Sequence, residues 1–307
     1  MPICERDSWR FQFFADVVCP EDVFIPTDDV DAWPWNPEQR WVYDKLKIAE
    51  SQNLPCGPHG VEPPSYPVFS KPIVNLKGMG IGSRVITSPD EMQKVSTPGH
   101  FWLPLLQGEH ISTDVAVVKG EAQWMRSAVG ITWHEGMFKH WVIETTQRVD
   151  LNQFLTTWIL GHLPGYTGML NFETIGGAII EVHLRFADQW CDLYGKGWFA
   201  ALVGLYAKGE WRLESEHKCV GYSVPLFATH GNMPMHPLPE LQQEIRSLPY
   251  VSSLQITFHE NKIGDEHPMP PGGFRLGLIN CTNLDAGFAA RKLLATAFPE
   301  CELLVPE

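Results

Sequence analysis

Strand pairs joined by short glycine turns constrain the fold of this chain most strongly. GMLNFET (168–174) and AIIEVHLRF (178–186) are rich in strand-forming residues, and Gly176-Gly177 between them favours a hairpin. Residues 110–133 repeat this arrangement around a second turn at Lys119-Gly120. Because hairpin strands are antiparallel and the expected helices alternate irregularly with them, we predict an α+β fold with antiparallel sheets.

The remaining elements are expected from composition and turn signals. Further strands are expected at residues 66–74, 84–87, 100–106, 221–227, 253–260 and 274–282. Helices are expected at residues 37–52, 149–163, 197–209, 238–247 and 285–298, and just after Ser88, which opens an S-x-x-E capping box. The proline-containing stretch DDVDAWPWNPEQ (28–39) is expected to be an irregular connector.

Composition and charge exclude several classes of protein. The chain has 307 residues, 44% of them hydrophobic, which is enough for a substantial core, and its net charge is −13. That negative charge argues against a nucleic-acid partner. The chain has no long uncharged apolar run and no signal pattern at its N-terminus, so we expect no membrane partner and a cytoplasmic location. Seven scattered cysteines without a CxxC pair are expected to be reduced thiols.

The glycine-rich stretch Lys77-Gly-Met-Gly-Ile-Gly-Ser83 is the first candidate for ligand binding. Its glycines, Gly78, Gly80 and Gly82, allow backbone N–H groups to approach an anion, and Lys71 and Lys77 supply positive charge. The stretch lacks the G-K-[ST] of a P-loop, and it leads into a strand rather than a helix. On these residues alone, a phosphate cradle and a plain glycine-rich hairpin are both open.

A second constellation lies on the hairpin at residues 168–186. Alternation along a strand puts Glu181, His183 and Arg185 on one face, and Asn171 and Glu173 share a face of the preceding strand. Two carboxylates brought close together repel unless a cation lies between them, and Mg²⁺ with phosphate oxygens is a natural occupant. The alternative is a solvated sheet face with surface ion pairs.

Taken in order, these motifs resemble the ATP-grasp superfamily of carboxylate–amine ligases, over roughly residues 41–190. The matching stretches are DKLKIAESQNLPCGP, YPVFSKPIVNLKGMGIGS, LLQGEHISTDVAVV and LNFETIGGAIIEVHLR. The resemblance implies two α+β subdomains with antiparallel sheets that grip a nucleotide. It divides the chain into an N-terminal extension (1–40), a small subdomain with the glycine-rich loop (41–120) and a large subdomain with the metal-binding strands (121–307).

The resemblance also implies roles for individual residues, with ATP and Mg²⁺ as cofactors. Lys71 and Lys77 would contact the phosphates, with Lys77 also catalytic, and residues 78–83, ending at Ser83, would close over them. Backbone groups near Leu106 would hold adenine, and Glu109 would bind the ribose.

On the hairpin, the implied metal ligands are Glu181, Glu173, Asn171 and His183. Arg185 would be catalytic, by stabilising a transferred phosphoryl group. The superfamily usually has Asn at the position of His183, and a neutral imidazole is a poorer Mg²⁺ ligand than an amide oxygen.

The implied activity is a Mg·ATP-dependent ligation. A small-molecule carboxylate is activated as an acyl phosphate and then joined to an amine or similar nucleophile. His183 and the short N-terminal extension leave open a non-catalytic ATP-binding sensor or partner subunit, and a small-molecule kinase is a third possibility. The short extension also implies that the C-terminal hundred residues, or another subunit of a homodimer, complete the acceptor site.

Overall fold

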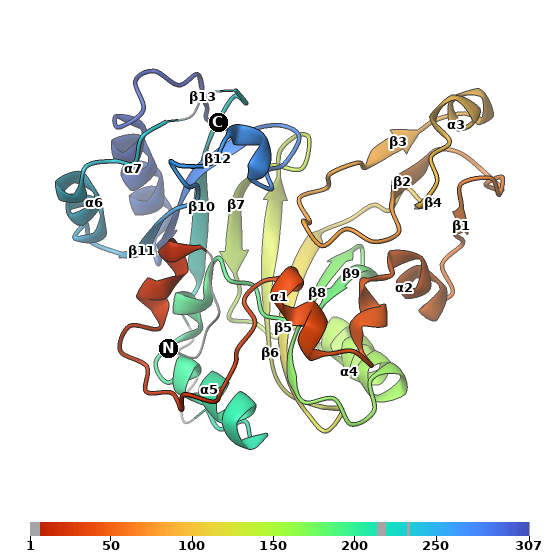
Figure 1. Ribbon diagram of the computed structural model, residues 1–307, viewed down its shortest axis with the longest axis horizontal. Helices are drawn as coiled ribbons and strands as arrows, with labels where there is room; N and C mark the ends of the chain where they lie inside the picture. The colour runs from red at the N-terminus through yellow and green to blue at the C-terminus, as the bar shows by residue number, and fades with distance from the viewer. Residues whose placement is uncertain (1–6, 214–218, 232–233, 307) are drawn as a thin grey trace.

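The computed structural model describes residues 7–213, 219–231 and 234–306 (Figure 1). Within these residues the strands form two separate antiparallel sheets. No helix in this part of the chain is both long enough and apolar enough to cross a membrane. The described cysteines are unpaired, while Cys4 lies outside the described residues.

The smaller sheet contains the residues around the glycine-rich loop. Its strand order is β1-β4-β2-β3. The strands are β1 (Gly57–Pro58), β2 (Val68–Pro72), β3 (Arg84–Ile86) and β4 (His100–Pro104). The helix α3 (Pro89–Val95) begins where the capping box predicts it: the Ser88 side chain accepts a hydrogen bond from the backbone N–H of Glu91. This sheet stands apart from the larger one in Figure 1.

The larger sheet has the order β11-β12-β10-β7-β6-β5-β8-β9, with β13 paired to β10. Its strands are β5 (His110–Val118), β6 (Glu121–Thr132), β7 (Phe138–Ile143), β8 (Gly168–Ile175), β9 (Ala178–His183), β10 (Gly221–Ala228), β11 (Val251–Ile256), β12 (Phe274–Cys281) and β13 (Leu303–Leu304). The chain passes from one sheet to the other between Pro104 and His110, so β5 already belongs to the larger sheet, before the expected boundary at residue 120.

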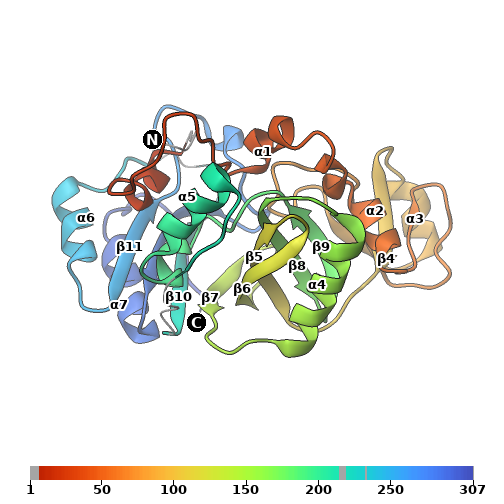
Figure 2. The same cartoon turned by 90° about the horizontal axis from the view of Figure 1, so that it is seen from below.

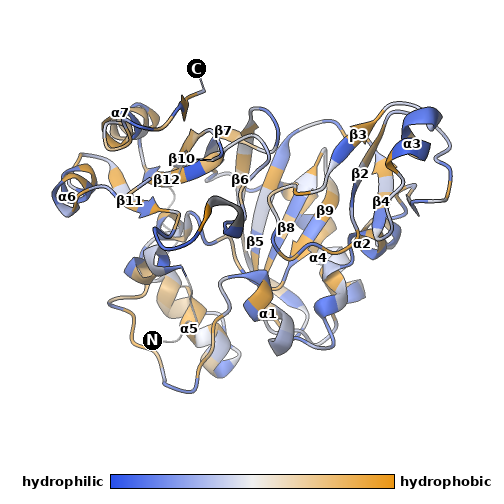
Figure 3. Cartoon of the chain, turned by 45° about the horizontal axis from the view of Figure 1, so that its top comes forward, coloured by the Kyte–Doolittle hydropathy of each residue, from blue (hydrophilic) through white to orange (hydrophobic). Residues whose placement is uncertain are grey.

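Helices pack on both faces of the larger sheet, and α4 lies on the face opposite the candidate ligands. They are α1 (Asp29–Trp35), α2 (Lys45–Ser51), α4 (Val149–His162), α5 (Trp198–Lys208), α6 (Pro239–Arg246) and α7 (Leu284–Ala295). Short 3₁₀ helices are η1 (Ser8–Phe13), η2 (Arg40–Tyr43), η3 (Cys191–Tyr194) and η4 (Gly264–Glu266). In Figure 3 the buried helix α5 is mostly hydrophobic, whereas α3 is mostly hydrophilic.

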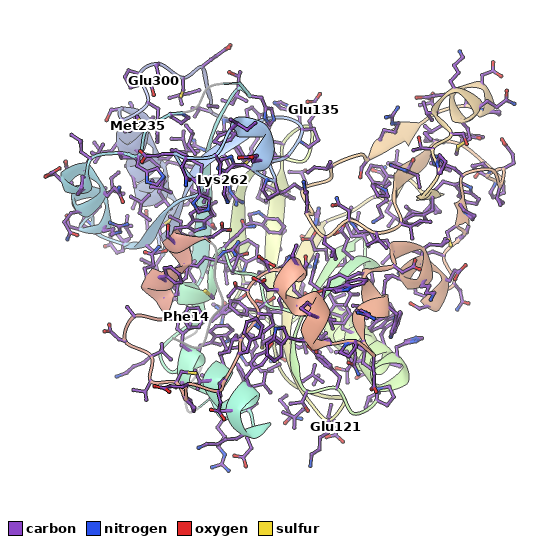
Figure 4. All side chains as sticks on the ribbon, in the orientation of Figure 1. Phe14, Glu121, Glu135, Met235, Lys262 and Glu300 are labelled. Carbon is purple, nitrogen blue, oxygen red and sulfur yellow. The ribbon has the colours of Figure 1, made fainter. Side chains whose placement is uncertain are left out.

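The two faces of β8 show how the core is divided. Leu170 and Phe172 pack with α4 and α2 in one hydrophobic cluster. Met169, on the opposite face, packs with α5 and the N-terminal segment in another, which includes the buried Phe14 (Figure 4). Asn171 and Glu173 share the face of Met169, so the candidate ligands lie on the face opposite α4. A third cluster joins α6 and α7 to β11 and β12.

The structure differs from the sequence prediction at several elements, of which three bear on the site and the larger sheet. The stretch 28–39 is not an irregular connector throughout, because α1 forms over Asp29–Trp35, with the Asp28 side chain accepting from the backbone N–H of Asp31. The helix expected at 37–52 is divided into η2 and α2. The strand β7 was not predicted, although it lies between β6 and β10 in the larger sheet.

Candidate functional site

The β8–β9 hairpin brings the expected acidic and basic residues together. In its register Glu173 lies opposite Glu181, and Asn171 lies opposite His183. Both pairs are on the face that α4 leaves uncovered. The hairpin predicted from the sequence therefore places two carboxylates, an amide and an imidazole side by side, as its alternation requires.

Glu181 is neutralised by lysines from the other half of the molecule. Lys45 Nζ lies 2.7 Å from Glu181 Oε1, and Lys71 Nζ donates to the backbone oxygen of Ile180 at 2.8 Å. Burial by itself would raise the pKa of Glu181, but the charges of Lys45 and Lys71 outweigh it and lower that pKa. Lysines near the smaller sheet and an acid of the larger sheet thus meet at one point.

Lys45 was not among the predicted site residues. It begins α2, whose N-cap Asp44 accepts from the backbone N–H of Lys47, and only 6% of Lys45 is exposed. A buried lysine requires a charged partner, and Glu181 is 136 residues further along the chain. One indication of its role was in the sequence, because Lys45 belongs to the DKLK stretch (44–47) that carries the resemblance.

Glu173 has a histidine neighbour of its own. The ring Nε2 of His110, at the start of β5, lies 3.0 Å from Glu173 Oε2. Burial would raise the pKa of Glu173, but the hydrogen bond and charge of His110 outweigh it, and the pKa falls to about 2. Glu173 is therefore a carboxylate at neutral pH.

Asn171 belongs to a buried hydrogen-bond network next to these acids. Its amide nitrogen donates to Ser112 Oγ and to Asp114 Oδ1, both at 2.8 Å. Asp114 also accepts from the Tyr194 hydroxyl and the Ala187 backbone N–H. The amide group of Asn171 is thus held by Ser112 and Asp114, and its role as a metal ligand stays a prediction.

His183 and Arg185 both contact Asp29, which the sequence analysis missed. His183 Nδ1 lies 2.8 Å from Asp29 Oδ2, and Arg185 Nε lies 3.3 Å from Asp29 Oδ1. Burial would raise the pKa of Asp29, but Arg185 and His183 outweigh it and hold the pKa well below its usual value. Asp29 begins α1, so the N-terminal segment contributes a carboxylate to this site.

The glycine-rich loop has a backbone conformation that favours glycine. Gly78, Gly80 and Gly82 all have positive φ angles, and side chains added at Gly78 or Gly80 would meet nothing within 4 Å. Ser83 closes a turn by donating its backbone N–H to the Gly80 oxygen at 3.1 Å. Lys77 is exposed on this loop and forms no ion pair with a described residue. Of the two predicted lysines, only Lys71 therefore reaches the acids.

The loop extends toward the larger sheet. A Cβ placed on Gly136, in the β6–β7 turn, would lie 3.5 Å from the backbone oxygen of Met79. In Figure 4, Glu135 of this turn lies at the upper edge of the larger sheet. The two halves therefore approach each other across the loop as well as at Lys45 and Lys71.

Glu109 is not brought to this cluster. Its carboxylate accepts from Arg148 Nη1 at 2.7 Å, just ahead of α4. It lines a cavity of about 480 Å³ together with Ile111 and Phe154. Ile111 faces away from His110 on β5, so this cavity lies on the α4 face of the sheet. Leu106 is in the connection between the sheets, where it packs against Phe101 and Leu103.

The donor atoms near the acids suit a divalent cation, but they do not form a site with oxygen ligands alone. Glu181 offers a carboxylate oxygen, whereas His183 offers a ring nitrogen, and Mg²⁺ prefers oxygen. Within the described ranges no group of three or more His, Cys, Asp or Glu side chains is assembled as a metal site.

No family model matches the chain, and no curated protein matches it. Solved structures do match. An L-amino acid ligase from Bacillus licheniformis matches with a TM-score of 0.61 and 13% identity, over 97% of this chain and 84% of that one. Carboxyaminoimidazole ribonucleotide synthase from Aspergillus clavatus, solved with ATP, matches at 0.57 and 12%, over 84% and 74%. Phosphoribosylamine–glycine ligase from Thermotoga maritima matches at 0.59 and 12%, over 93% and 85%.

Proposed function

We propose a function on the premise that this chain has the ATP-grasp fold, which the solved ligases share. The same structural likeness confirms the predicted α+β class. The chain would bind ATP between its two sheets, activate a small-molecule carboxylate as an acyl phosphate and join it to an amine. One observation carries the proposal: Lys45 and Lys71 meet Glu181 on the hairpin that also holds Glu173 and Arg185.

The reaction needs positioning and charge more than a protein nucleophile. An oxygen of the substrate carboxylate attacks the γ-phosphorus of ATP, the bond from that phosphorus to the bridging oxygen breaks, and ADP leaves. The amine nitrogen then attacks the carbonyl carbon of the acyl phosphate, inorganic phosphate departs, and the nitrogen loses a proton.

The chain's own residues would provide the charge. Lys45 and Lys71 are buried lysines beside a carboxylate, and the phosphates of ATP would take up part of their positive charge. Arg185 would spread the charge of the transferred phosphoryl group, once its contact with Asp29 loosens. A divalent cation, held by Glu181 and His183, would supply further neutralisation of the phosphates.

The proposal is tested by ADP release from ATP with a panel of carboxylates and amines, in the presence of both Mg²⁺ and Mn²⁺. Lys71→Met and Glu181→Gln are each expected to lower turnover by about 10²–10³-fold, the usual cost of losing one aligned charged group. Lys94→Met is the matched control, because Lys94 is an exposed lysine of α3. Equal turnover in Lys71→Met and Lys94→Met would contradict the proposal.

A second function is supported by Asp29. Because this carboxylate already pairs with Arg185 and His183, the chain could bind ATP without phosphoryl transfer, as a sensor or partner subunit. Calorimetric ATP binding with no ADP release for any substrate pair would favour this reading. A kinase on the same fold would instead release ADP and leave a stable phosphorylated product without condensation.

A further inference from the structure

A second cavity, of about 400 Å³, lies between α7 and the segment that follows β13. Its walls are mostly apolar and include Leu226 of β10 and Phe288 and Ala295 of α7. Arg291 and Lys292, also on α7, are the basic residues that line it. The volume lies within the range of roughly 300–1,000 Å³ that is usual for small-molecule sites. The cavity therefore combines apolar walls with two basic side chains.

This cavity is on the opposite face of the larger sheet from the acids. Trp141 of β7 packs against His110, the partner of Glu173, so Trp141 faces the acids. His140, the preceding residue, faces the other way and contacts Phe288 of α7, with ring centres 5.8 Å apart. In Figure 1, α7 lies at the end of the molecule away from the smaller sheet. A ligand of this cavity therefore does not depend on the proposed nucleotide binding.

Arg291 is a buried charge with no acidic neighbour in the part of the chain that the structure describes. It is 7% exposed, and burial is what lowers its pKa. Its Nη2 donates to the backbone oxygen of Pro306 at 3.4 Å, and its guanidinium lies 4.9 Å from the centre of the Phe288 ring. Its Nη1 is buried without a hydrogen-bond partner among the described residues. A guanidinium stays charged in proteins, so burying it without a counter-ion costs free energy.

The side chains around Arg291 do not supply the missing negative charge. Burial, helped by the charge of Arg291, lowers the pKa of His140, so that ring is neutral at neutral pH. Lys292 is exposed and adds a second positive charge. The cavity is thus locally positive, although the chain as a whole carries a net charge of −13. These charges favour an anionic ligand.

We propose that this cavity binds a small monocarboxylate with an apolar chain. The carboxylate pairs with Arg291, whose planar fork of N–H donors matches a carboxylate, and the chain lies along the apolar walls. One buried guanidinium balances one negative charge. A phosphate group brings nearly two charges and three acceptor oxygens, whereas Leu226 and Phe288 have no donors to offer it.

Calorimetric titration of the full chain with butyrate, hexanoate and octanoate tests the proposal. The affinity is expected to rise about fourfold for each methylene group that is buried, until the cavity is filled. Octanamide has the same chain without the charge and should bind at least about tenfold more weakly. Inorganic phosphate should not compete with octanoate. The proposal is overturned if octanoate does not bind, if octanamide binds equally well, or if phosphate displaces octanoate.

Two variants assign the binding to this cavity. Arg291→Met removes the charge, keeps an apolar side chain of similar length, and should weaken octanoate binding by at least about tenfold. Arg212→Met, at an exposed arginine outside the cavity, is the matched control and should bind octanoate like the wild type. Ala295→Leu leaves Arg291 in place but fills part of the cavity, so it should weaken octanoate binding more than butyrate binding. Circular dichroism confirms that each variant is folded.

Thermal unfolding separates a binding role of Arg291 from a structural one. The ligand-free wild type carries an uncompensated buried charge, so Arg291→Met should melt at the same temperature or higher. Octanoate should raise the melting temperature of the wild type but not that of Arg291→Met. A lower melting temperature of Arg291→Met, with octanoate binding unchanged, would assign this arginine to the fold and overturn the proposal.

The chain itself offers one competing anion. Glu307 follows Pro306 in the sequence and lies outside the described residues. Glu307→Gln removes this carboxylate, and octanoate is expected to bind this variant with the affinity of the wild type. Octanoate binding that appears only in Glu307→Gln would show that Glu307 is the partner of Arg291, and it would overturn the proposal.

Discussion

At the scale of single residues, Lys71 is a lysine whose charge changes near physiological pH. It is 3% exposed, and its ammonium lies 5.9 Å from the centre of the Phe101 ring. Burial, helped by the neighbouring Lys45 charge, lowers the pKa of Lys71 to about 8, although Glu181 and Glu173 oppose the shift. An anionic ligand would meet a charged Lys71 only below that pH.

We therefore predict that ATP affinity falls as the pH rises through 8. The protonated fraction of Lys71 declines above its pKa, while the triphosphate stays fully ionised, so the loss is up to about tenfold per pH unit. Calorimetric titration between pH 7.5 and 9.5, where the triphosphate is fully ionised, checks this. Lys71→Met should bind ATP more weakly and with a flat profile in that range, and a falling profile in this variant would assign the titration to another group.

Asp114 is a second buried group with a shifted pKa. Burial raises its pKa to about 6, even though Tyr194, Ala187 and Asn171 all donate to it. Asp114→Ala leaves these buried donors unpaired, so we expect the free energy of unfolding to fall by about 2–5 kcal/mol. Urea unfolding measures this, with exposed Asp22→Ala as a control expected to change little.

The sign of the pH effect at Asp114 follows from the same shift. The folded state holds the proton up to about pH 6, whereas the unfolded chain loses it near 3.8. The contribution of Asp114 to stability is therefore complete below about pH 4 and declines as the pH rises to 6. The stability difference between wild type and Asp114→Ala should be larger at pH 4.5 than at pH 7.5. Equal differences at the two pH values would show that Asp114 is ionised throughout this range.

At the scale of elements, the β8–β9 turn touches the connection between the two sheets. Gly176 and Gly177 both have positive φ angles, but their surroundings differ. A Cβ on Gly176 would lie 2.2 Å from the backbone oxygen of Gln107, whereas one on Gly177 would meet nothing within 4 Å. The hairpin that carries the acids is thus held against the connection by a contact that only glycine allows at position 176.

Alanine substitution separates the backbone strain at a positive φ angle from the steric contact with Gln107. Gly177→Ala should cost only the backbone strain, about 1–2 kcal/mol of unfolding free energy. Gly176→Ala has the same strain and must also displace the backbone at Gln107, so it should cost at least about 1–3 kcal/mol more. Thermal or urea unfolding of both variants tests this, and equal losses would mean that the connection moves without cost.

Elements with strong local signals were predictable from the sequence. The two-glycine turn and the alternation of Glu181, His183 and Arg185 led to the β8–β9 hairpin and its polar face. The unpredicted β7 has the sequence FKHWVI, in which Lys139 and His140 interrupt the apolar pattern of a central strand. Pro34 inside α1 concealed that helix.

The pairing of the missed residues has no local signal, even where the residue itself lies in a matched stretch, as Lys45 does. Asp29 lies 154 residues from His183, and Lys45 lies 136 residues from Glu181. Periodicity reports on neighbours in one element, so it cannot pair side chains that only tertiary packing brings together. The same reason explains Glu109, whose partner Arg148 is set by the position of α4.

At the scale of the whole molecule, the candidate site belongs to three parts of the chain. The smaller sheet contributes Lys71, the larger sheet contributes Glu173 and Glu181, and the N-terminal segment contributes Asp29. In Figure 2 the N-terminal segment and α1 lie along one side of the larger sheet, between α6 and the smaller sheet. A ligand that bridges these parts would couple their stabilities.

We predict that ATP with a divalent cation raises the melting temperature of the whole chain as one transition. At a ligand concentration of 100 times Kd the gain is about 2.7 kcal/mol. Differential scanning calorimetry with and without ligand checks this, and Lys71→Met should lose most of the shift. A ligand-dependent shift confined to an early, partial transition would place binding on one half only.

The N-terminal segment also makes contacts that span most of the sequence. Gln12 Nε2 donates to the backbone oxygen of Leu254, 242 residues away, and Arg10 pairs with Asp188. During synthesis on a ribosome these partners emerge long after the segment itself. The contacts of η1 with β11 can therefore form only after β11 has left the exit tunnel.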